Sequence, residues 1–103
     1  MRGMNDVISD LKAWFEDRKT TLIDLGLRAD FNDSPSGRAK RSAALTVASA
    51  QRIAQLVVWE TGEAELSLGD VGSKDVVEEH REITSKIGIR DATETLMAWL
   101  KQS

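Results

Sequence analysis

The fold is decided by the stretch from Arg52 to Leu68, which reads RIAQLVVWETGEAELSL. Apolar and β-branched residues precede Glu60-Thr61-Gly62 and an apolar–polar alternation follows it, which predicts strands over 52–59 and 64–68. A two-residue turn would place the β-branched Thr61 at positive φ. A three-residue loop needs positive φ only at its last position, and Gly62 adopts that conformation at little cost. We therefore predict an antiparallel hairpin closed by a three-residue loop.

This loop fixes the register of the hairpin and so assigns the two faces of its strands. Trp59 then opposes Glu63, and Leu56 opposes Leu66. The face that we expect to point inward carries Ala54, Leu56, Val58, Ala64, Leu66 and Leu68. The face that we expect to point outward carries Ile53, Val57, Trp59, Glu63, Glu65 and Ser67. A register shifted by one residue would instead turn Leu56 and Val58 outward.

Period-two alternation also predicts strands outside the hairpin. From Ile23 to Phe31 apolar residues alternate with polar ones, which predicts a half-buried strand. The turn-forming residues of 32–37 end this strand. Further strands are predicted over 42–49 and 75–83, and a turn over 69–73.

Both ends of the chain predict amphipathic helices. At the N-terminal end Asn5 is a candidate cap, Thr20-Thr21 weakens the helical pattern, and an apolar stripe is formed by Met4, Val7, Ile8, Leu11, Trp14 and Phe15. At the C-terminal end Asp91 and Glu94 have capping-box spacing and open a helix with the stripe Ala92, Leu96, Trp99 and Leu100. The sequence thus predicts a single α+β domain over 1–103, an antiparallel meander of about five strands packed against an N-terminal and a C-terminal helix.

The composition excludes several classes of protein. The chain has 103 residues, of which 41% are hydrophobic and 30% charged, as expected of one folded domain. It has no cysteine, which excludes disulfides, thiolate zinc sites and thiol catalysis. No apolar run approaches the ~20 residues of a transmembrane helix. Residues 1–6 lack the apolar stretch of a leader, so we expect the mature protein to begin there and to stay in a bacterial cytoplasm.

The net charge of −3 is distributed unevenly along the chain. Residues 60–82 hold eight acidic and two basic side chains, which gives this segment a net charge of −6. Such a surface repels nucleic-acid phosphates and attracts a basic cleft on a partner. The alternative is that the carboxylates only face solvent, as charged strand faces usually do. The basic run Arg38-Ala39-Lys40-Arg41 lacks a helix N-terminus or a glycine cradle, so we expect a solvated loop there.

The single histidine is the only candidate for catalysis that the sequence offers. In a strand His80 shares a face with Glu78 and Glu82, which suits a carboxylate–imidazole pair. No serine elbow and no metal-ligand spacing accompany it. We therefore predict no catalytic residues, no metal, no cofactor and no enzymatic activity. A small metal-dependent enzyme that uses His80 is a third, less favoured hypothesis.

Short motifs between Arg41 and Ser85 point to a family. Residues 59–62 make a tryptophan-acid-x-glycine hairpin, Gly69-Asp70-Val71 follows, and 79–85 leads towards a helix. With a helix at each end, this arrangement resembles the TriTu family of immunity proteins, which accompany bacterial polymorphic toxins. The resemblance implies a non-enzymatic antitoxin in the cytoplasm of the producer. It also implies that the toxin is an ADP-ribosyltransferase, delivered by type VI secretion within an Rhs protein, whose cleft the immunity protein occludes.

The residues that we expect to bind the toxin lie on the outward face and in the acidic run. The apolar ones are Val57 and Trp59, and the acidic ones are Glu60, Glu63, Glu65, Glu78 and Glu82. We expect a protein partner, neither nucleic acid nor membrane, and a monomer in the free state. Two alternatives stay open: a loop or the 32–37 connection covers the outward face, or the protein is a homodimeric adaptor or chaperone for a secreted effector.

Overall fold

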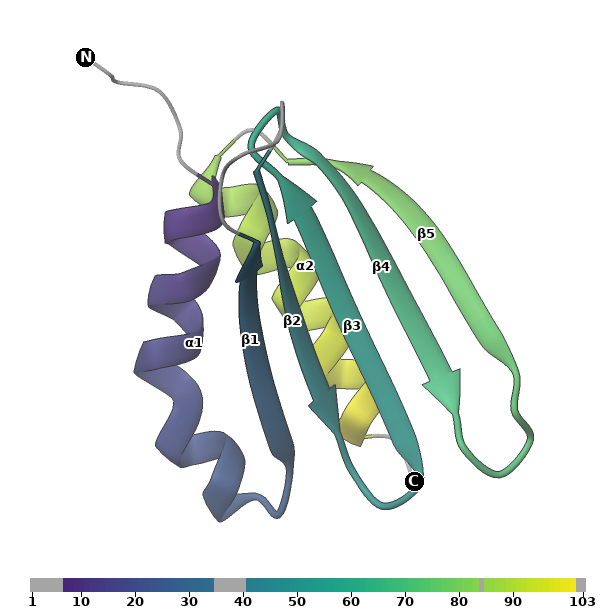
Figure 1. Ribbon diagram of the computed structural model, residues 1–103. Helices are drawn as coiled ribbons and strands as arrows, with labels where there is room; N and C mark the ends of the chain where they lie inside the picture. Colours follow the sequence, from purple (N-terminus) through teal and green to yellow (C-terminus); the bar gives the residue numbers. More distant parts are fainter. Residues whose placement is uncertain (1–6, 35–40, 84, 102–103) are drawn as a thin grey trace.

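The protein is an α+β sandwich of one sheet and one layer of helices, seen in a computed structural model that describes residues 7–34, 41–83 and 85–101. The elements in chain order are α1 (Val7–Asp24), β1 (Arg28–Ser34), β2 (Ser42–Ala48), β3 (Arg52–Trp59), β4 (Glu63–Asp70), β5 (Val76–Glu82) and α2 (Lys86–Lys101). The five strands form one antiparallel sheet in the order β1-β2-β3-β4-β5, and both helices lie on the same face of it (Figure 1). The predicted fold class is confirmed.

The hairpin of β3 and β4 has the predicted register. Val58 pairs with Ala64 and Leu56 pairs with Leu66, while Gly62 closes the loop with φ +100°. The amide of Gly62 donates to the carbonyl oxygen of Trp59 over 2.8 Å. The prediction of a three-residue loop is therefore confirmed, and the alternative register is wrong.

The core lies between the helices and the inward face of the sheet. The sheet contributes a contiguous set of buried side chains, namely Ala43, Leu45, Val47, Ala54, Leu56, Val58, Ala64 and Leu66. Helix α1 covers them with Val7, Ile8, Leu11 and Leu22, and α2 with Ile89, Ala92, Leu96 and Leu100. Each fully buried aliphatic side chain contributes about 1.5–3 kcal/mol, so this face holds the fold together and is not available to a partner.

The predicted strand from Ile23 is wrong over its first half, because α1 continues through Thr20-Thr21 to Asp24. Gly26, at φ +81°, ends the helix, and its amide donates to the carbonyl oxygen of Ile23. The amide of Leu27 donates to the carbonyl oxygen of Leu22, and both side chains are buried. These bonds form a Schellman motif. The apolar residues at such a helix end alternate with polar ones over 23–27 and so resemble a strand in sequence. Only 28–34 form the strand.

The predicted start of the second helix is also wrong. Helix α2 begins at Lys86, where the amides of Gly88 and Ile89 both donate to the carbonyl oxygen of Ser85, and Asp91 lies inside the helix. The predicted stripe holds, since Ala92, Leu96 and Leu100 are buried and Trp99 packs against the core. Asn5, Met4, the turn residues 35–37 and most of the basic run, 38–40, lie outside the described residues.

Candidate functional site

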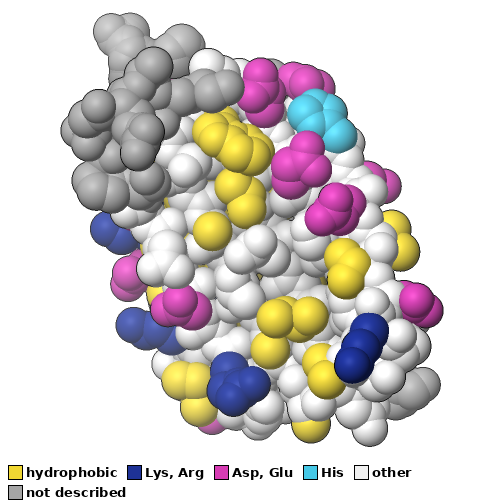
Figure 2. Space-filling model, turned by 45° about the vertical axis from the view of Figure 1, so that its right-hand side comes forward, with side chains coloured by type: hydrophobic (Ala, Val, Ile, Leu, Met, Phe, Trp, Pro, Cys, Tyr) yellow, Lys and Arg dark blue, Asp and Glu magenta, His cyan; other side chains and the backbone are white. Residues whose placement is uncertain are grey.

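The face of the sheet opposite the helices, here called the outer face, is the candidate site. Within the described residues no helix covers it, and Figure 2 shows apolar and acidic side chains exposed there. Pairing and alternation bring most of the predicted contact residues together on it: Val57 and Trp59 on β3, Glu63 and Glu65 on β4, Glu78 and Glu82 on β5. Glu60 is exposed in the loop beside them. Their role in binding stays a prediction.

The apolar part of the outer face runs along β3. Trp59 and Val57 are partly exposed and Ile53 is exposed. Their neighbours on the adjoining strand are small: Ser42 pairs with Trp59, and Ala44 pairs with Val57. Because these partners are short, the larger side chains of β3 stand above the sheet surface, which is the usual form of an apolar anchor at an interface.

The acidic part of the outer face lies over the half of β4 and β5 that contains His80 (Figure 2). Glu63 pairs with Glu82 directly across the two strands, and Glu78 pairs with Ser67. Like charges opposite one another destabilise an isolated sheet. A cluster of this kind is stabilised by a cationic partner, so its charge favours a basic binding surface.

His80 lies within the acidic cluster and bridges two of its carboxylates. Its Nδ1 lies 3.1 Å from Oε2 of Glu65, and its Nε2 lies 2.9 Å from Oε2 of Glu82. Hydrogen bonds to Glu82 first and to Glu65 second raise the pKa of His80 above its ordinary value of 6.5. The predicted carboxylate–imidazole contact is thus made by Glu82 and not by Glu78. The contact of Glu65 with His80 was not predicted, because no tight turn between β4 and β5 fixes the register that pairs the two residues.

The surroundings of His80 suit charge compensation better than catalysis. Both ring nitrogens face carboxylates, so neither is left to accept a proton from a hydroxyl nucleophile. Among the described residues no group of three or more histidine, aspartate or glutamate side chains is arranged to hold a metal ion. The arrangement allows His80, when protonated, to offset part of the charge of Glu65 and Glu82.

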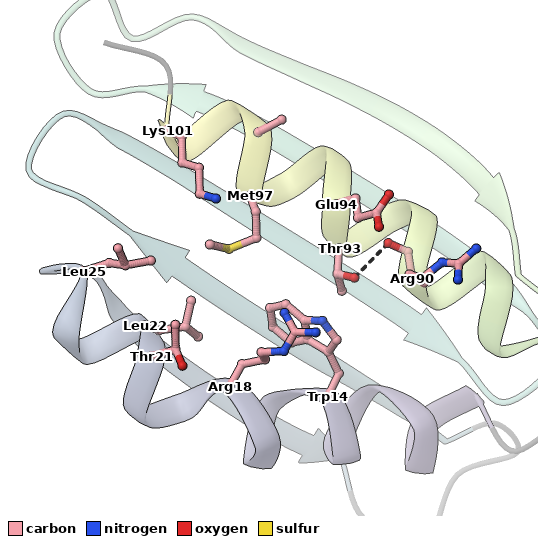
Figure 3. Close-up of a pocket in the computed structure, with 11 residues that line it drawn as sticks. Trp14, Arg18, Thr21, Leu22, Leu25, Arg90, Thr93, Glu94, Met97 and Lys101 are labelled. Atoms are coloured by element: carbon pink, nitrogen blue, oxygen red, sulfur yellow. Dashed lines mark hydrogen bonds between the residues drawn. The ribbon is translucent and has the colours of Figure 1, made fainter.

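The helical side of the molecule carries a groove whose charged lining is mostly basic. This groove of about 440 Å³ runs between α1 and α2, with Trp14, Leu22 and Met97 along it and three basic side chains, Arg18, Arg90 and Lys101, against one acidic one, Glu94 (Figure 3). Arg18 lies 5.6 Å from the centre of the Trp14 ring. This groove was not predicted from the sequence, because its basic residues are far apart in the chain. A basic side chain is therefore attracted to the acidic cluster more than to this groove.

Comparison with known proteins places the chain in a family. Neither described helix has the length and apolar character needed to cross a bilayer. No curated protein matches the chain in sequence. The family model described as "Immunity protein TriTu" matches residues 9–99, which run from the first helix to the second and include the whole sheet. The chain belongs to the TriTu immunity protein family.

Proposed function

We propose that this protein neutralises a cognate bacterial toxin domain by binding it one to one through the outer face of the sheet. Membership of an immunity protein family supports an antitoxin role and a protein toxin as the partner. The observation that carries the choice of surface is the placement of both helices on one side, which leaves the apolar side chains of β3 beside an acidic cluster. That combination is an apolar centre with a charged rim.

The acidic cluster supports an ADP-ribosyltransferase as the toxin. An enzyme that holds a dinucleotide binds two phosphates, and phosphates are held by basic side chains and amide donors. Glu60, Glu63, Glu65, Glu78 and Glu82 present carboxylates of the sign that such a cleft attracts. In this proposal the outer face covers the cleft and excludes its substrates, and the immunity protein contributes no chemistry of its own.

The apolar and acidic residues have different tasks in this proposal. Val57 and Trp59 supply the buried contacts that slow dissociation, because large apolar side chains at the centre of an interface carry most of its energy. The glutamates at the rim speed the encounter and set the orientation. The protein acts as a monomer in the cytoplasm of the producing cell, where it meets any toxin made there before secretion.

The proposal is tested by co-expressing the protein with the toxin domain encoded by the gene immediately upstream. We expect rescue of growth, co-purification at a one-to-one ratio, and loss of toxin activity at stoichiometric immunity protein. Light scattering on the free protein distinguishes this proposal from the adaptor hypothesis, because the adaptor hypothesis requires a stable homodimer that buries Trp59. A toxin that stays fully active in the presence of excess immunity protein would contradict the proposal.

A further inference from the structure

A second apolar feature lies at the end of the outer face away from Trp59. It is a shallow hollow of about 180 Å³ lined by Thr46, Ile53, Gln55, Ser67, Gly69 and Val76, here called the Gly69 hollow. Ile53 and Trp59 lie near the two ends of β3, so at ~3.3 Å per residue the hollow and the indole are about 20 Å apart. An interface of about 800 Å² per partner is wide enough to cover both.

The hollow exists because Gly69 has no side chain. Gly69 pairs with Ile53 on one side and with Val76 on the other. A Cβ atom at Gly69 would lie 3.2 Å from Cγ2 of Ile53 and 3.6 Å from Cγ2 of Val76. These two side chains form the walls of the hollow, and they are 41% and 60% exposed. The protein therefore presents two methyl-bearing walls that its own fold leaves uncovered.

Two of the polar side chains that line the hollow, Thr46 and Gln55, are hydrogen-bonded to each other. Nε2 of Gln55 donates to Oγ1 of Thr46 over 3.1 Å, across the pair that they form between β2 and β3. The hollow is large enough to hold several water molecules. Water beside methyl groups has few hydrogen-bond partners, so its displacement by an apolar group is favourable.

We propose that the Gly69 hollow receives one apolar side chain of the toxin, and that a lysine or arginine beside it in the toxin reaches Glu78. Glu78 pairs with Ser67 and follows Val76 by two residues on the same face of β5, so a carboxylate borders the hollow. A protein side chain is the occupant that fits, because the hollow is too shallow to enclose most of a small molecule. This inference rests on the proposed function and adds a second anchor to it.

The first test compares two adjacent valines of β5. Val76 lines the hollow and is 60% exposed, and Val77 is 59% exposed with its side chain on the opposite face of the sheet. We expect Val76→Ser to weaken binding of the upstream-encoded toxin domain about tenfold, measured by isothermal titration calorimetry. We expect Val77→Ser to bind like the wild type. The two variants remove the same exposed side chain from the same strand, so effects on folding cancel in the comparison.

A second pair of variants tests the other wall. Ile53→Ser removes the wall on β3, and Ile87→Ser on α2, where the side chain is 61% exposed, is its control. A third variant, Ser67→Phe, fills the hollow with a residue that favours strands. We expect thermal unfolding to show a folded protein. We expect titration to show an affinity for the toxin domain that is lowered about tenfold or more.

The outcomes separate this inference from the proposed function. If Val76→Ser and Ile53→Ser bind like the wild type while Trp59→Ala binds weakly, the hollow has no part in binding and only this inference is overturned. If Trp59→Ala also binds like the wild type, the outer face is not the interface and both are overturned. Weak binding by Val76→Ser beside normal binding by Val77→Ser supports the inference.

Discussion

The indole Nε1 of Trp99, on α2, donates a hydrogen bond of 3.1 Å to the carbonyl oxygen of Gly69, on β4. The guanidinium carbon of Arg52 lies 4.3 Å from the centre of the Trp99 ring, and Nη1 of Arg52 donates to the carbonyl oxygen of Trp99 over 3.1 Å. The C-terminal end of α2 is thus fixed to two strands from the inward side. The hydrogen bond from Trp99 also holds the backbone of Gly69, which lines the hollow on the outer face.

Trp99→Phe should lower the free energy of unfolding by about 1 kcal/mol. The variant keeps most of the ring but removes the donor to Gly69, and a protein hydrogen bond contributes roughly 1 kcal/mol net. Urea denaturation followed by circular dichroism measures the change. Trp99→Ala, which also removes the ring under Arg52, should lower the free energy of unfolding by about 3 kcal/mol. An unchanged stability in both variants would show that the buried side chains of α2 hold the helix without Trp99.

The sheet was predictable because its signals are local. The three-residue loop at Glu60-Thr61-Gly62 is set by the conformation that Thr61 resists and Gly62 accepts, and that loop fixes which face of β3 and β4 points inward. Most of the proposed contact surface follows from this register. The contact between Glu65 and His80 does not, because the pairing of β4 with β5 passes through a longer turn.

The ends of the helices were not predictable from local sequence patterns. Residues 23–27 alternate like a strand, but the hydrogen bond from the amide of Leu27 to the carbonyl oxygen of Leu22 belongs to a helix terminus at Gly26. Asp91 and Glu94 have capping spacing inside a helix that begins at Lys86. In both places tertiary packing against the sheet extends a helix beyond its local signal, since burial of an apolar stripe outweighs capping preferences of about 1 kcal/mol.

Gly26→Ala should destabilise the protein by about 1 kcal/mol, because φ at this position is +81° and no neighbouring atom limits the space. The cost is therefore one of backbone conformation and not of a steric clash. Gly26→Asn should recover part of the loss, since asparagine tolerates the left-handed region better than alanine. Thermal unfolding of the three proteins checks this order, and an alanine variant as stable as the wild type would contradict the Schellman assignment.

Trp59→Ala should weaken the complex with the toxin by about 2 kcal/mol or more, as expected of a central aromatic anchor. Titration calorimetry measures the loss. Ile87→Ala, which removes an exposed apolar side chain from the helical side, is the control and should bind normally. If the two variants bind the toxin with equal affinity, Trp59 is not part of the interface.

Reversal of Glu63 and Glu65 to lysine should mainly slow association, and the difference from the wild type should grow at low salt. A matched control reverses Glu16 and Glu94 on the helices, which changes the net charge by the same amount on the other side of the molecule. Stopped-flow measurements of the association rate at several salt concentrations compare the two double variants. Equal slowing of both double variants would mean that net charge, and not the outer face, steers the encounter.

His80 should titrate with a pKa above 6.5, because Glu82 and Glu65 stabilise its protonated form. In an NMR titration Glu82→Gln should lower this pKa more than Glu65→Gln, since the bond to Glu82 has the larger effect. A pKa raised by folding contributes stability that is full below pH 6.5 and is lost as the pH rises through the folded value. The stability of the wild type relative to His80→Asn should therefore fall over that interval in urea titrations at successive pH values. A constant difference from acid to alkaline pH would show that the two carboxylates do not bind the ring in solution, and the acidic cluster would then carry its full charge towards the toxin.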